Sequence, residues 1–88
     1  MFEARVKVGN KLGLHARPAA LLVQTAERFK SHIMLVKDGL EVNAKSIMGV
    51  MMLAAEMGSE ILIRATGEDE REAVEELVLL VKSKFGEE

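Results

Sequence analysis

The spacing of apolar residues changes along this chain, and each change predicts a different secondary structure. In residues 2–8 every second residue is apolar, which is typical of a β-strand with one buried face. From residue 19 the apolar positions recur every three or four residues, as on one helix face: Ala19, Leu22, Val23, Ala26 and Phe29. We place the start of this helix between His15 and Pro18, because a residue that precedes proline is disfavoured in the α conformation.

The middle of the chain predicts a hairpin followed by a short helix. Residues 33–37 and 40–42 have strand character and are joined by Asp38 and Gly39, a pair that favours a tight hairpin turn. Ser46 is a good N-cap for a short helix over residues 47–53, and a fourth strand follows over residues 60–65.

The last segment predicts the clearest helix. Asp69 together with Glu72 resembles a capping box at its start. We expect its buried face to consist of Val74, Leu77, Val78, Val81 and Phe85. Glu87 and Glu88 are expected to form a solvated tail.

The resulting order, β-α-β-β-α-β-α, predicts an α+β fold. We expect an open-faced β-sandwich, in which three helices cover one face of a four-stranded, mainly antiparallel sheet. A chain of 88 residues with 49% hydrophobic content can bury one small core, so residues 1–88 are expected to form a single domain.

Composition argues against several classes of function. A net charge of −2 and only three aromatic residues disfavour a nucleic-acid partner. The chain has no cysteine and only two histidines, which are far apart in sequence, so we expect neither a metal site nor a cofactor. The longest apolar run is too short for membrane insertion, and a cytoplasmic location is the expectation.

His15 is the strongest candidate for chemistry, although a surface histidine without a role is the simpler alternative. Gly13 permits a tight turn before the helix, so the imidazole can lie at the helix edge. The first amides of the helix, those of Ala16 and Arg17, offer unpaired N–H groups that suit a phosphate. The positive helix end also favours a neutral, nucleophilic ring. The Arg17 side chain adds several donors for phosphate oxygens.

The block Gly13-Leu14-His15-Ala16-Arg17-Pro18-Ala19-Ala20 resembles the active-centre motif of the HPr family, the histidine-containing phosphocarriers of the bacterial phosphoenolpyruvate-dependent sugar phosphotransferase system. The resemblance implies that His15 receives a phosphoryl group on Nδ1 from phosphorylated enzyme I and passes it to sugar-specific enzyme IIA proteins. It also implies that Arg17 neutralises charge on the transferring group. Such a protein is a carrier and not an enzyme.

A second block, Lys45-Ser46-Ile47-Met48-Gly49-Val50-Met51, resembles the regulatory serine region of Gram-positive HPr proteins. From the residues alone, Ser46 is a helix cap. The resemblance implies that it is also phosphorylated by HPr kinase/phosphorylase. The added charge would disfavour enzyme I and favour a catabolite-control transcription factor.

The short helix after Ser46 cannot bury all of its apolar side chains. We therefore expect Ile47, Met48 and Met51 to be partly exposed near His15 and to form a docking patch for partner proteins. A small carrier that presents one face to several partners is expected to be a monomer. The second histidine, His32, is expected to be solvent-exposed.

Two related functions remain as alternatives. One is a carrier of the nitrogen-regulatory phosphotransferase branch, which shares the histidine motif, although the Ser46 block favours the sugar branch. The other is a regulatory corepressor module that acts through Ser46 alone. His15 speaks against the second alternative, because the HPr-related catabolite-repression paralogue lacks this histidine.

Overall fold

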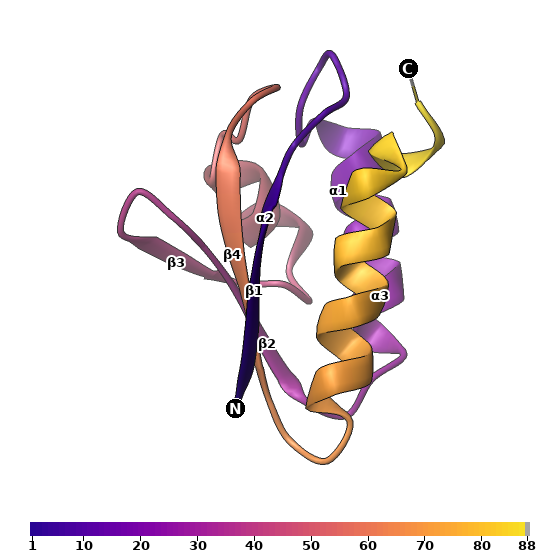
Figure 1. Ribbon diagram of the computed structural model, residues 1–88. Helices are drawn as coiled ribbons and strands as arrows, with labels where there is room; N and C mark the ends of the chain where they lie inside the picture. Colours follow the sequence, from indigo (N-terminus) through magenta and orange to yellow (C-terminus); the bar gives the residue numbers. More distant parts are fainter. Residues whose placement is uncertain (88) are drawn as a thin grey trace.

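The computed structural model describes residues 1–87, and its elements follow the predicted order (Figure 1). The strands are β1 (Phe2–Lys7), β2 (His32–Lys37), β3 (Leu40–Asn43) and β4 (Glu60–Thr66), and the helices are α1 (Ala16–Glu27), α2 (Ile47–Met52) and α3 (Glu70–Lys82). A single 3-10 turn, η1 (Lys84–Gly86), follows α3. No helix among the described residues is both long and apolar enough to cross a membrane.

The four strands form one antiparallel sheet in the order β1-β4-β2-β3. β4 lies in the centre, where it pairs with β1 on one side and with β2 on the other. In Figure 1, α1 and α3 lie side by side on one face of this sheet. The predicted α+β class, with helices on one face of an open sheet, is confirmed.

The core lies between the sheet and the helices. Alternate residues of β4 point toward the helices, and Ile61, Ile63 and Ala65 are fully buried. The helix faces that cover them carry Ala19, Leu22, Ala26, Val74, Leu77 and Val81, all fully buried. This packing fixes the position of α1, whose first residues carry the predicted site.

The predicted capping box at the start of α3 is wrong. The Asp69 carboxylate does not cap its own helix; it accepts hydrogen bonds from the backbone N–H groups of Lys30 (2.8 Å) and Ser31 (2.9 Å) and from the Ser31 hydroxyl. These hydrogen bonds, above all that of the Ser31 hydroxyl, hold the pKa of Asp69 below its usual value. Glu70, and not Glu72, reaches back, accepting from the Gly67 N–H at 3.1 Å. Asp69 therefore joins the start of β2 to the start of α3.

The end of α3 also differs from the prediction. Phe85 is buried, as expected, but the helix stops at Lys82 and Val78 is only half-buried. Lys84, Phe85 and Gly86 all have positive φ angles (59°, 55° and 74°). Phe85 has the right spacing to continue the buried face of α3, but it reaches the core from a left-handed turn. This turn ends the helical path and places Phe85 in the core.

Candidate functional site

His15 lies immediately before α1 as its N-cap residue, in an extended conformation (φ −75°, ψ −171°). Its carbonyl oxygen accepts the first helical hydrogen bond, from the Ala19 N–H at 3.0 Å. Its ring makes no capping bond, and the side chain is 34% exposed. The predicted helix boundary is confirmed: Pro18 is the third helical residue, where no N–H donor is required. The ring is therefore accessible from outside.

Gly13 sets the approach to His15 because only glycine fits at this position. Its φ is +67°, and a Cβ atom there would lie 2.3 Å from the carbonyl oxygen of Ala55. The next residue, Leu14, donates its N–H to the same oxygen at 2.9 Å. The turn before α1 thus packs directly against the segment that follows α2.

The start of α1 provides further donors beside the ring. The backbone N–H groups of Ala16 and Arg17 have no hydrogen-bond partner within residues 1–87, as is usual for the first turn of a helix. Both residues are exposed. The predicted combination of His15, two free amides and an exposed Arg17 is therefore present in one place.

Glu87 is a member of this site that the sequence prediction missed. Its Oε2 and Oε1 atoms lie 3.1 Å and 3.2 Å from His15 Nε2, and its Oε1 accepts from Asn10 Nδ2 at 3.0 Å. The predicted solvated tail is wrong for Glu87, whose side chain is only 19% exposed. Glu88 lies outside the described residues. The contact was not visible in sequence because 72 positions separate Glu87 from His15.

The electrostatics of Glu87 reflect these contacts. Burial acts to raise the pKa of its carboxyl group, but hydrogen bonds from His15 and Asn10, together with the charges of His15 and Arg17, outweigh burial and lower that pKa. The carboxylate is thus held in its charged form beside the ring.

Ser46 occupies the predicted N-cap position of α2. Its Oγ accepts a hydrogen bond from the Gly49 N–H at 3.0 Å, and the residue is half-buried. The predicted exposure of the next residues is confirmed, with Ile47, Met48 and Met51 at 45%, 75% and 43%. α2 packs against α1, which begins directly after His15.

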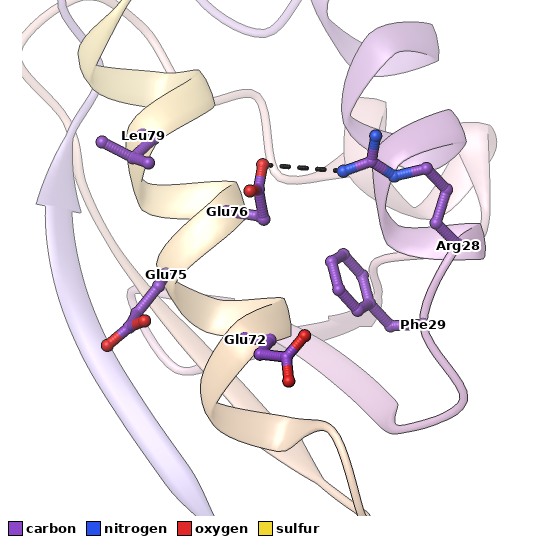
Figure 2. A pocket seen from close by; sticks show the side chains of 6 residues that line it. All are labelled: Arg28, Phe29, Glu72, Glu75, Glu76 and Leu79. Atoms are coloured by element: carbon purple, nitrogen blue, oxygen red, sulfur yellow. Dashed lines mark ion pairs between the residues drawn. The ribbon is translucent and has the colours of Figure 1, made fainter.

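A shallow pocket lies elsewhere on the molecule, between the C-terminal end of α1 and α3 (Figure 2). Three glutamates line it, namely Glu72, Glu75 and Glu76, and Glu76 pairs with Arg28 at 3.5 Å. Arg28 follows the last residue of α1, about 18 Å from its start at a rise of 1.5 Å per residue. This pocket is separate from His15, and its acidic lining disfavours an anion.

A half-exposed histidine at a helix start, with free amides and an exposed arginine beside it, suits the binding of a phosphoryl group. Comparison with known proteins identifies the class. Residues 2–83 match the family model described as "PTS HPr component phosphorylation site". The chain belongs to the HPr family of phosphocarriers, which act in the phosphotransferase system.

The similar proteins include both phosphocarriers named HPr and HPr-like proteins named Crh. The chain is 55% identical over its full length to the phosphocarrier protein HPr of Treponema pallidum, covering all of that protein. It is also 55% identical to the HPr-like protein Crh of Bacillus subtilis, over 93% of this chain and 96% of Crh.

Solved structures give the same result. HPr-C-His from Thermoanaerobacter tengcongensis superposes with a TM-score of 0.96 at 55% identity, over 100% of this chain and 99% of that one. A structure described as an HPr dimer from the same organism gives a TM-score of 0.80 at 54% identity, over 99% and 100% of the two chains. The fold of this chain is that of HPr.

Proposed function

We propose that this chain carries a phosphoryl group on His15, which accepts it from phosphorylated enzyme I and donates it to enzyme IIA proteins of sugar transport. The observation that carries the proposal is the position of His15 at the start of α1, with its ring accessible and both first-turn amides free. Those amides and Arg17 would bind the phosphoryl oxygens and balance their charge.

The chain needs no catalytic apparatus of its own for this role. A carrier must let its phosphorylated histidine enter the active sites of other proteins, and the exposure of His15 suits that requirement. Exposed Ile47, Met48 and Met51 on α2 would form the docking patch, because flexible methionine side chains adapt to partners of different shape. A monomer presenting this face is part of the proposal.

Similarity to Crh favours a second, regulatory role through Ser46. A phosphate on the Ser46 hydroxyl would lie at the start of α2, where backbone amides and the helix dipole tolerate negative charge. We propose that HPr kinase/phosphorylase modifies this residue, and that the modified protein binds a catabolite-control transcription factor. His15 separates this proposal from a module that acts through Ser46 alone.

Labelling with phosphoenolpyruvate and enzyme I tests the carrier role. We expect one acid-labile, alkali-stable phosphate per chain, as for phosphohistidine, and no label on the His15→Ala variant. His32→Ala is the matched control, because His32 is also exposed and should not affect labelling. Label that persists without His15 contradicts the proposal.

Labelling with ATP and HPr kinase tests the regulatory role. We expect an acid-stable phosphate on the wild-type chain, none on Ser46→Ala, and slower labelling of His15 by enzyme I after modification. A wild-type chain that the kinase leaves unmodified contradicts this half of the proposal.

A further inference from the structure

The segment that follows α3 also contacts the predicted phosphorylation site. After α3, Lys84 and Phe85 adopt left-handed backbone conformations that are unfavourable for residues with a side chain. Phe85 is 4% exposed and anchors this turn in the core. Glu87 directly follows this turn, and its carboxylate contacts His15.

A buried amide holds Glu87 in this place. Asn10 is fully buried, and its Nδ2 donates to the Gly13 carbonyl oxygen at 2.8 Å and to Glu87 Oε1 at 3.0 Å. Both of these partners can only accept, so the amide cannot be turned round without opposing two acceptors to its own oxygen. Asn10 Oδ1 has no partner among the residues that the structure describes. Asn10 therefore ties Glu87 to the same turn that sets the position of His15.

From these contacts we infer that Glu87 is a positioning residue, which holds the His15 ring with a proton on Nε2 and leaves Nδ1 as the nitrogen that accepts the phosphoryl group. An ionised carboxylate has no proton to give, so a hydrogen bond at 3.1 Å requires that Nε2 be the donor. In the neutral ring, Nδ1 then keeps its lone pair. This inference rests on the proposed function.

The transfer step balances with this assignment. The Nδ1 lone pair forms the new N–P bond as the bond between phosphorus and the phosphorylated donor protein breaks, and that bonding pair returns to the donor. The proton stays on Nε2, so the phosphorylated ring becomes a cation. The Glu87 carboxylate, 3.1 Å from Nε2, would balance that charge. In the onward transfer the N–P electron pair returns to Nδ1, and the neutral ring is restored with its proton still on Nε2.

Nitrogen-15 NMR of the unphosphorylated chain tests the positioning directly. In the wild type we expect a slowly exchanging, downfield Nε2 proton on His15 and a pyridine-like Nδ1. Glu87→Ala should lose the protected proton, and Glu87→Gln, which retains an acceptor oxygen, should recover part of the signal. Glu75→Ala is the control, because it removes a glutamate that is exposed and lies mid-way along α3.

Phosphoryl transfer from enzyme I supplies the second measurement. We expect roughly three- to tenfold slower labelling of Glu87→Ala, the range expected for the loss of one hydrogen bond, with partial rescue in Glu87→Gln and no change in Glu75→Ala. Far-ultraviolet circular dichroism checks that each variant is folded. An unchanged ring spectrum and an unchanged rate in Glu87→Ala would overturn the inference while the proposed function stands. A wild-type chain that takes no label overturns both, and a lost ring signal with an unchanged rate refutes the role in transfer.

Discussion

Replacing Gly13 by alanine should destabilise the protein and disturb His15 together. The left-handed conformation at this residue (φ +67°) costs about 1–2 kcal/mol for a residue with a Cβ atom. The new Cβ would also lie 2.3 Å from the Ala55 carbonyl oxygen, so one of the two segments must move. That movement breaks the 2.9 Å hydrogen bond from Leu14, which is worth about 1 kcal/mol. We expect a loss of about 2–3 kcal/mol in the free energy of unfolding.

Gly39→Ala is the matched control for this measurement. Gly39 also has a positive φ (+82°), but a Cβ atom there meets nothing within 4 Å. It should lose only the conformational cost of about 1–2 kcal/mol. Urea unfolding followed by circular dichroism suits this chain, which has no Trp or Tyr. Each kcal/mol corresponds to a shift of about 4–8 °C in Tm for a domain of this size. Equal losses in the two variants, or slowed phosphoryl transfer in Gly39→Ala, would refute the argument from close approach.

Three further predictions concern the surroundings of the site. Ser46→Ala should lower the free energy of unfolding by about 1 kcal/mol, because it removes the cap on Gly49, whereas Ser46→Asp should keep most of it; thermal unfolding measures both. Met48→Asp should weaken binding to enzyme I in titration calorimetry and leave stability within about 0.5 kcal/mol, because Met48 is 75% exposed. The lowered pKa of Asp69 means that its stabilising effect is complete above the ordinary value of 3.8 and is lost as pH falls through the lower, folded value. Asp69→Ala should thus be less stable than wild type at pH 7, and the two Tm values should converge in acid; a constant difference would contradict this.

The fold was predictable because its signals are local. Strand alternation in residues 2–8, the hairpin pair at Asp38 and Gly39, and the helical spacing from Ala19 each depend on neighbours within a few positions. The Ser46 cap is equally local, since its acceptor and donor lie three residues apart. α1 begins at Ala16, within the predicted range of His15 to Pro18, although the steric effect of Pro18 on Arg17 favours a later start.

The errors arose where a local pattern competes with a distant partner. Asp69 has the spacing of a capping residue, but its carboxylate accepts hydrogen bonds from Lys30 and Ser31 instead. These two residues lie almost 40 positions earlier in the chain. Phe85 continues the apolar spacing of α3, yet the backbone has already left the helix. Glu87 at the chain end has the composition of a solvated tail, and only the left-handed turn brings it to His15.

Glu87 adds a second electrostatic influence to the site, and it acts on the ring and not on the phosphoryl oxygens. Free amides and Arg17 favour the phosphoryl oxygens, and the Glu87 carboxylate, 3.1 Å from Nε2, favours the positive charge that the ring gains on phosphorylation. Under the proposed function, Glu87 therefore assists the ring as a nucleophile through Nε2 and also keeps the Nε2 proton on the phosphorylated ring, so that the ring leaves as a neutral imidazole in onward transfer. Glu87→Gln separates the two effects, because it retains an acceptor for Nε2 and removes the charge. Its phosphorylated form should hydrolyse and transfer more slowly than that of the wild type, and faster loss of phosphate would contradict the electrostatic half of this reasoning.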